Sequence, residues 1–298
     1  DPLLETTILG AFNNAIAPEN PHFGICDQSS KPLDISLFSF ASQISYEHID
    51  PKISTGHCWS RHRIQNFYEN EDYYFQIDSH MQFENGWDEY LLKYMIKIQS
   101  DQSEFHKLPI ISSYPRAFDV IDFDKKIFKL LDDDKKTHTI AYREDSIFLK
   151  DTFSRQIGAI SETEITHGYL LAAGCLFAPG NFVKEVPYDS EFYFYGEEIS
   201  IMLRAFTRGF SIFHIPAVPV FHLYTDVSHI KRKLHWDEEE DKKREIKWHE
   251  REEKSIKRLS QIIDGKLDGI FGLGDKRSLE DYEFLSGINF KKRSVTNK

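Results

Sequence analysis

The pattern of apolar and polar positions in the first third of the chain predicts helices that alternate with strands. Leu4, Ile8 and Phe12 recur at the spacing of one helix face. Apolar, β-prone runs follow at 22–27, 73–77 and 108–111, and helical spacing returns at 57–68 and 87–98. Alternation of this kind is typical of an α/β domain.

Beyond residue 115 the pattern becomes less regular. Residues 116–160 are charged and lack a long period, which predicts short antiparallel strands with a loop tip at 132–136. Periodic segments then return as a strand at 170–177, a helix at 198–207, a strand at 210–213 and a charged helical run at 236–263. The second half therefore continues the order of strand, helix and strand.

With 298 residues, the chain is long enough for one large domain or two of ordinary size. We expect a nucleotide-binding half at 1–115, an acceptor and catalytic half at 116–230, and a charged helical extension at 231–298 that packs on the same domain. The opening helical pattern has no strand before it, whereas α/β domains normally begin with one. Either the sequence begins late or the fold lacks that strand, which leaves room for a preceding anchor or targeting segment.

Composition narrows the classes of protein. The formal net charge of -11 argues against a chain that wraps nucleic acid or lies on an anionic membrane. No run reaches the ~18 consecutive apolar residues of a membrane span, and no signal pattern opens the chain. Cys26, Cys58 and Cys175 are widely spaced and odd in number, which is typical of reduced thiols. We expect a soluble cytoplasmic protein with no nucleic-acid partner and no integral membrane segment.

Candidate chemistry begins where the predicted strand at 73–77 ends in Asp78, Ser79 and His80. Residues i and i+2 of a strand point to the same side, so Asp78 and His80 can converge on one ion while Ser79 points away. Oxygen and imidazole ligands suit Mn²⁺, and also Zn²⁺ or Fe²⁺. Two later histidines, His214 and His222, lie near strand ends and are candidates for a third ligand.

Three other segments carry candidate binding or catalytic residues. Arg61, upstream of the metal strand, can pair with a phosphate or a carboxylate. Gly174 lies in a predicted strand, where glycine often marks the close approach of a ligand or of another backbone. Gly196, Glu197 and Glu198 open a helix, whose positive end accounts for Glu198 but leaves Glu197 unexplained.

The order of these pieces resembles glycosyltransferases with the GT-A fold, and the resemblance covers most of the chain. Its parts are a strand ending in Asp-x-His, a glycine strand, a Gly-Glu-Glu helix start and a late histidine. The strings at 77–83, 194–199 and 271–277 are similar to the UDP-N-acetylglucosamine transferase family that includes the Skp1 hydroxyproline-modifying enzyme. Asp-Ser-His at 78–80 more distantly resembles polypeptide N-acetylgalactosaminyltransferases.

The resemblance implies a fold and a metal site. The fold would be α/β of GT-A type, a central mixed sheet flanked by helices, with the first strand, which holds uracil in such enzymes, missing from the chain. Asp78, His80 and His222 would bind Mn²⁺, with Mg²⁺ as a substitute. His222 is preferred to His214 because it matches the late histidine of the family.

The resemblance also assigns residues to the donor and to the reaction. Those that would contact the nucleotide or the sugar are Arg61, Asp78, Ser79, Gly174 and Gly196. Glu197 and Glu198 would be the catalytic carboxylates. In an inverting enzyme either could act as the base on the acceptor hydroxyl, whereas the resembled family is retaining, which would make Glu197 a positioning group.

The expected activity is therefore Mn²⁺-dependent transfer of N-acetylglucosamine from UDP-N-acetylglucosamine to a hydroxyl of a protein or glycan acceptor, with retention. Three alternatives remain open at this stage. The first is a transferase of the same fold that uses another UDP-sugar for polysaccharide synthesis. The second is a metal-dependent hydrolase with Glu197 as the base, and the third is a sugar-nucleotide or glycan-binding protein without turnover.

Overall fold

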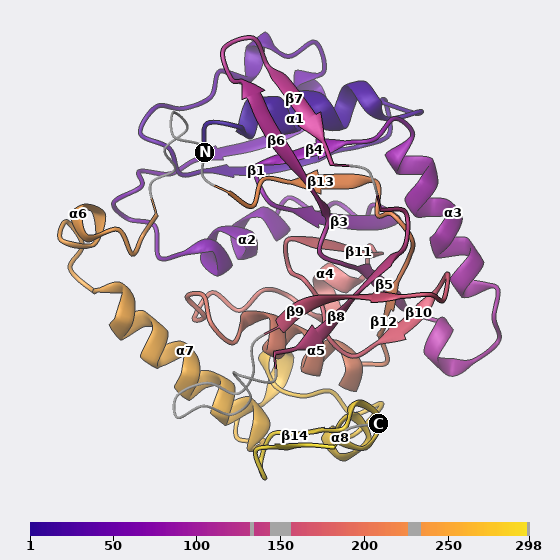
Figure 1. Cartoon of the computed structure of the whole chain (residues 1–298). Helices are drawn as coiled ribbons and strands as arrows, with labels where there is room; N and C mark the ends of the chain where they lie inside the picture. The colour runs from indigo at the N-terminus through magenta and orange to yellow at the C-terminus, as the bar shows by residue number, and fades with distance from the viewer. Residues whose placement is uncertain (132–133, 144–155, 226–233, 297–298) are drawn as a thin grey trace.

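The computed structural model describes residues 1–131, 134–143, 156–225 and 234–296. Its helices are α1 (Leu4–Asn14), α2 (His57–Gln65), α3 (Trp87–Gln99), α4 (Phe182–Glu185), α5 (Glu197–Thr207), α6 (Glu238–Asp241), α7 (Trp248–Ile263) and α8 (Leu279–Ser286). Its strands are β1 (Phe23–Asp27), β2 (Ile44–His48), β3 (Tyr73–Ile77), β4 (Met81–Phe83), β5 (Pro109–Ser112), β6 (Arg116–Asp122), β7 (Ile127–Leu130), β8 (Thr137–Tyr142), β9 (Gln156–Ser161), β10 (Thr166–Gly168), β11 (Cys175–Pro179), β12 (Ser211–His214), β13 (Val220–His222), β14 (Ile288–Asn289) and β15 (Ser294–Val295). Figure 1 shows their arrangement.

A mixed sheet in the order β10-β12-β5-β11-β3 forms the centre of the molecule. Strand β12 is parallel to β5, whereas β11 runs antiparallel to both of its neighbours. Side chains of β11 alternate between two cores: Leu176 and Ala178 join the one that contains α4 and α5, and Cys175 and Phe177 join the one that contains α3. The predicted mixed sheet flanked by helices is confirmed.

A second sheet, in the order β4-β13-β6-β7, begins where the first one ends. Strand β4 follows β3 after a short turn and pairs antiparallel with β13, which lies parallel to β6. Helix α1 packs on β4. Smaller pairs complete the structure: β1 is parallel to β2, and β8 with β9 and β14 with β15 form antiparallel pairs.

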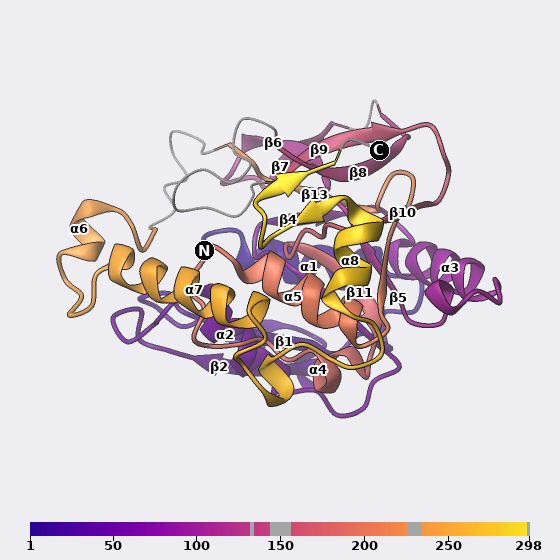
Figure 2. The same ribbon diagram turned by 90° about the horizontal axis from the view of Figure 1, so that it is seen from below.

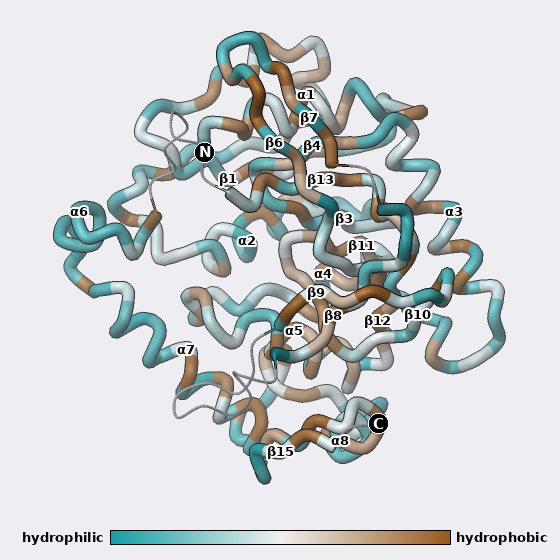
Figure 3. Tube along the Cα trace, in the orientation of Figure 1, coloured by the Kyte–Doolittle hydropathy of each residue, from teal (hydrophilic) through white to brown (hydrophobic). Residues whose placement is uncertain are grey.

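The C-terminal helices pack on the half of the molecule that carries α5. Figures 1 and 2 place α7 and α8 beside α5, and Leu259, Ile262 and Ile263 join its core. In Figure 3, α6 and much of α7 are hydrophilic, in keeping with their charged sequence. Helix α7 also holds the loop that leads into α5, because Ser255 Oγ accepts from Tyr193 N at 2.7 Å and Glu252 accepts from Tyr195 N at 3.0 Å.

One local prediction differs from the structure. The run at 170–177 was expected to be a strand, but β11 starts at Cys175 and the preceding residues form an irregular connection. The physical reason is that backbone groups there bond side chains: Ala172 N donates to Ser112 Oγ at 2.9 Å and Ala173 N to Glu198 Oε1 at 2.9 Å. The expected loop tip at 132–136 falls partly outside the described residues, and residues 134–136 lie between β7 and β8 without belonging to either strand.

Among the described residues, no helix combines the length and the apolar character needed to cross a membrane.

Leu259 links the C-terminal extension to the start of α5. Its side chain is fully buried, and a Cβ at Gly196 would lie 3.2 Å from Leu259 Cδ2. Leu259→Ala should therefore lower the free energy of unfolding by about 2–5 kcal/mol, measured by urea denaturation. Lys257→Ala, at an exposed position of the same helix, is the matched control and should change it by less than about 0.5 kcal/mol. Equal effects of the two substitutions would contradict the packing described.

Candidate active site

Asp78, His80 and His222 lie together where the two sheets meet. Asp78 and His80 belong to the turn between β3 and β4, and His222 ends β13. Their ligand atoms all lie within 4.8 Å of one another. His80 Nε2 is 2.9 Å from His222 Nε2, and His222 Nε2 is 3.3 Å from Asp78 Oδ2. One carboxylate and two imidazoles therefore converge on a single point.

The reason for this convergence differs from the one expected. Strand β3 ends at Ile77, so Asp78 and His80 do not share one face of a strand. Instead, the turn carries the chain into β4, and the pairing of β4 with β13 sets His222 opposite Met81, next to His80. The sheet register, rather than the i, i+2 alternation, brings the histidines together.

Arg61 connects this group to a second carboxylate. Its Nη2 donates to Asp78 Oδ1 at 2.7 Å, and its Nη1 donates to Glu197 Oε1 at 2.7 Å and to Tyr188 Oη at 3.2 Å. Burial by itself would raise the pKa of Asp78, but the hydrogen bond from His222 and the charge of Arg61 hold it well below its usual range. Asp78 is therefore ionised at neutral pH, with one oxygen toward Arg61 and the other toward His222.

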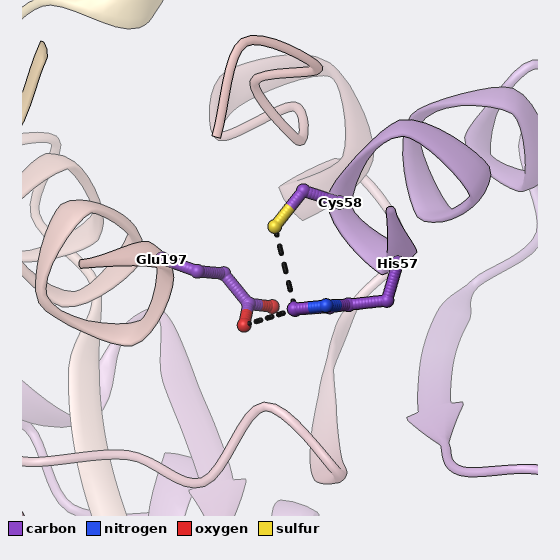
Figure 4. Close-up of side chains that lie close together, drawn as sticks. All are labelled: His57, Cys58 and Glu197. Carbon is purple, nitrogen blue, oxygen red and sulfur yellow. Dashed lines mark hydrogen bonds and ion pairs between the residues drawn. The ribbon is translucent and has the colours of Figure 1, made fainter. Parts of the chain in front are cut away.

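Glu197 lies in the first turn of α5 and is held by two residues of α2. His57 and Arg61 are four positions apart, so both lie on the helix face that meets Glu197. His57 Nε2 is 2.7 Å from Glu197 Oε2, and Figure 4 shows this contact beside Cys58. Burial alone would raise the pKa of Glu197, but the charges of His57 and Arg61 lower it to about 2. The carboxylate is thus fixed in position and strongly ionised.

His57, Cys58 and Glu197 also have the composition of a metal site, but their surroundings disfavour an ion. Both oxygens of Glu197 are already paired, one with Arg61 Nη1 and the other with His57 Nε2. Burial and the charge of Glu197 raise the pKa of the Cys58 thiol well above its ordinary value, whereas metals bind the thiolate. We interpret this cluster as an ion-pair network. Sequence reasoning missed His57, although its i, i+4 spacing from Arg61 on a predicted helix was a usable signal.

Glu198 has different surroundings from its neighbour. It accepts a hydrogen bond from Ala173 N at 2.9 Å and another from the Gln156 amide. Burial, together with the charge of Glu197, raises the pKa of Glu198 to about 7. In the structure Glu198 therefore anchors the connection before β11, and no direct contact joins it to Asp78, His80 or His222 among the interactions of the described residues.

The remaining predicted residues lie around Asp78 or beneath Glu197. A Cβ at Gly174 would come within 2.6 Å of Asp78 Oδ2, so only glycine leaves room for that carboxylate. Ser79 follows Asp78 in the turn, where its carbonyl accepts from Thr7 Oγ1 at 2.9 Å. Gly196 precedes α5 with φ +89°, a conformation that favours glycine, and it faces Leu259 rather than the Asp78 group.

His214, the alternative third histidine, lies away from this group. It is buried in β12, and its Nδ1 donates to the Ser112 carbonyl at 2.7 Å. Burial lowers the pKa of His214 to about 4. It is a neutral core histidine in the structure.

Comparisons with solved structures define the class of fold. The crystal structure of GalNAc-T7 with UDP, GalNAc and Mn²⁺ is similar, with a TM-score of 0.56 and 12% sequence identity. The match covers 98% of this chain and 53% of that one, so this chain spans about half the length of the solved structure. The likeness shows a glycosyltransferase fold of GT-A type.

The family follows from the sequence match. A family model described as glycosyltransferase (GlcNAc) matches residues 26–270, which is most of the chain. The chain therefore belongs to the GlcNAc glycosyltransferase family. No curated protein matches it.

The raised pKa of Glu198 generates a prediction on stability and pH. In the folded protein Glu198 retains a proton that the unfolded chain releases at lower pH. The stability that this bound proton contributes is full below the unfolded pKa and is lost as the pH rises through about 7. Glu198→Gln carries no such proton and keeps an oxygen for Ala173 N. Its free energy of unfolding relative to the unsubstituted protein should be higher at about pH 8 than at about pH 5, by roughly 2 kcal/mol in urea denaturation.

Glu280→Gln, at an exposed position of α8, is the matched control and should show no comparable dependence on pH. The assignment is wrong if Glu198→Gln and the unsubstituted protein differ by the same amount at both pH values.

Proposed function

We propose that this protein is a Mn²⁺-dependent glycosyltransferase that transfers N-acetylglucosamine from UDP-N-acetylglucosamine to a hydroxyl of a protein or glycan, with retention. The observation that carries the proposal is the convergence of Asp78, His80 and His222 beside the Arg61–Glu197 ion pair. This group lies at the carboxyl end of β3, in a chain of a GlcNAc glycosyltransferase family. Ligands of α/β folds bind at such strand ends.

The donor set fits the proposed ion. One carboxylate oxygen and two imidazole nitrogens suit Mn²⁺, for which Mg²⁺ is a possible substitute. His222 Nδ1 is buried without a hydrogen-bond partner among the described residues. The contacts of His222 Nε2 with His80 and Asp78 therefore orient the imidazole ring. An ion held by these three residues would act as a Lewis acid and stabilise the charge of the departing diphosphate. Arg61, with its charge directed at the same carboxylate, adds a second cation near the phosphates.

The charge state of Glu197 supports the role of a positioning group. A carboxylate whose pKa is about 2 is a weak base, so it is poorly suited to accept the proton of an acceptor hydroxyl or of a water molecule. This argues against an inverting reaction, and against a hydrolase, with Glu197 as the base. With retention, an oxygen of the leaving phosphate accepts the proton and Glu197 orients the donor sugar or the acceptor.

The donor sugar and the compartment are proposed from two further observations. The description of the matching family favours N-acetylglucosamine, whereas GalNAc-T7 was crystallised with UDP and GalNAc, so UDP-N-acetylgalactosamine is the second candidate donor. The three cysteines are free thiols, which fits a reducing compartment, and we propose the cytoplasm.

Donor cleavage tests the proposed activity without a known acceptor. Transferases of this kind can release UDP slowly by transfer to water, so we would measure UDP release from the GlcNAc, GalNAc, glucose and galactose donors. We expect release from UDP-N-acetylglucosamine with Mn²⁺ and none with EDTA. No binding of UDP in calorimetry, with or without Mn²⁺, would contradict the proposal.

Two variants separate metal binding from turnover. His80→Ala removes a proposed ligand and should weaken Mn²⁺-dependent UDP binding at least about tenfold in calorimetry, whereas the exposed His48→Ala should not.

Glu197→Gln should leave UDP binding nearly intact but lower turnover roughly 100-fold, with the exposed Glu191→Gln as control. Unchanged UDP affinity in His80→Ala would refute the metal assignment, and normal turnover in Glu197→Gln would remove Glu197 from the reaction.

A further inference from the structure

Tyr188 lies in the loop between α4 and α5, and its side chain is fully buried. Its hydroxyl lies beside the Arg61–Glu197 ion pair: Arg61 Nη1 donates to Tyr188 Oη at 3.2 Å, and a hydrogen bond joins Tyr188 to Glu197. A buried tyrosine hydroxyl usually has a hydrogen-bond partner. Here the partners include two charged groups of the candidate active site, so the hydroxyl is part of the network that holds Glu197.

Gln76 holds the hydroxyl from the side of β3. Its Nε2 donates to Tyr188 Oη at 2.5 Å and also to the Ala173 carbonyl, and its Oε1 accepts from Tyr74 Oη at 3.0 Å. A carbonyl oxygen can only accept, so the bond to Ala173 fixes which end of the Gln76 amide is the NH₂ group. Gln76 is therefore a donor toward Tyr188.

These contacts assign the direction of the bond between Tyr188 and Glu197. A hydroxyl has one proton to donate and two positions that accept. Arg61 and the Gln76 amide nitrogen are donors, so they occupy the two accepting positions of Tyr188 Oη. Burial raises the pKa of Tyr188 well above its ordinary value, so the hydroxyl keeps its proton at neutral pH. That proton is the one left for Glu197.

The backbone of Tyr188 is tied to the helix that carries Arg61. Tyr188 N donates to Gln65 Oε1 at 2.7 Å, and His62 Nδ1 lies 2.8 Å from the Tyr188 carbonyl oxygen. Gln65, His62 and Arg61 all belong to α2. The hydroxyl is therefore fixed relative to the same helix as the guanidinium, and both donors reach Glu197 from set positions.

The number of these donors limits how many hydrogen bonds Glu197 can accept from a substrate. An ionised carboxylate accepts at about four positions. Arg61 and His57 take one each, on different oxygens, and Tyr188 takes a third. The Glu197 side chain is 8% exposed, so the position that is left can be reached from outside the network. That position suits one hydroxyl group.

We propose that Tyr188 is a positioning residue that acts through Glu197: its hydroxyl orients the carboxylate so that the remaining acceptor position faces a single hydroxyl group of the substrate. The proposal rests on the proposed function, in which that group belongs to the donor sugar or to the acceptor. Without the tyrosine hydroxyl, Glu197 keeps its charge, because Arg61 and His57 remain, but its orientation is less fixed. Substrate binding should then change little, whereas turnover should fall.

Carbon NMR tests the contact without any donor or metal. In protein labelled with carbon-13 at the side-chain carboxyl of glutamate, the Glu197 resonance is the one that Glu197→Gln removes. Tyr188→Phe should shift this resonance at neutral pH, because the carboxylate loses a donor. Tyr282→Phe, which removes another buried hydroxyl that donates to the Tyr169 carbonyl, is the matched control and should not shift it. An unshifted resonance in Tyr188→Phe would overturn the proposal.

Kinetics tests the same role in turnover. In UDP release from UDP-N-acetylglucosamine with Mn²⁺, Tyr188→Phe should lower kcat at least about tenfold and leave KM within about twofold. In the Glu197→Gln background the same substitution should lower kcat by less than about twofold, because the group through which it acts has changed. A second tenfold loss in that background, or a raised KM with normal kcat, would contradict the assignment.

Gln76→Met provides a second variant in case Tyr188→Phe does not fold. It leaves the tyrosine hydroxyl in place but removes the amide that holds it, so it should shift the Glu197 resonance and lower kcat in the same direction. An unshifted resonance in Gln76→Met would then overturn the proposal. If the unsubstituted protein binds no UDP and releases none, the proposed function fails, while the Glu197 resonance still decides whether Tyr188 holds the carboxylate.

Discussion

The site depends on one guanidinium that joins a buried carboxylate, Glu197, to a half-buried one, Asp78. Arg61 on α2 pairs with Asp78, at the end of β3, and with Glu197, at the start of α5. Glu197 lies 136 positions from Arg61 in the sequence, and a carboxylate shielded from water is costly without a cation. Because Arg61 presents a planar fork, it holds the carboxylates at a set separation, which a lysine would not do.

The same pairing divides the carboxylates by role. Asp78 and Glu197 are both ionised, and in the proposed function Asp78 binds the cation while Glu197 accepts hydrogen bonds from the donor sugar. Glu198, the next residue after Glu197, forms no ion pair with another described residue, and its pKa rises to about 7. Adjacent positions of α5 thus hold two different groups. Glu197 is charged and faces Arg61, whereas Glu198 carries a proton near neutral pH and supports the connection before β11.

Local patterns predicted much of the fold. Helical spacing located α1, α3 and α5, and the aromatic run located β3, because each segment buries one face whatever its distant partners are. The β4–β13 pairing was not predictable in this way, since it joins residues about 140 positions apart in strands of three residues. The apolar run before Cys175 was misassigned because side chains of Ser112 and Glu198 take its backbone groups. For the site, sequence and resemblance proposed Asp78, His80 and His222, which the structure brings together. His57 was missed, although its i, i+4 spacing from Arg61 was a usable signal for its contact with Glu197.

The most direct test of this account is a crystal structure with UDP and Mn²⁺, with anomalous scattering recorded at the manganese absorption edge. The account predicts one strong peak bonded to Asp78, His80 and His222 and to the diphosphate, with Arg61 still paired to Glu197. A peak at His57, Cys58 and Glu197, or bound UDP with no manganese near Asp78, would contradict it.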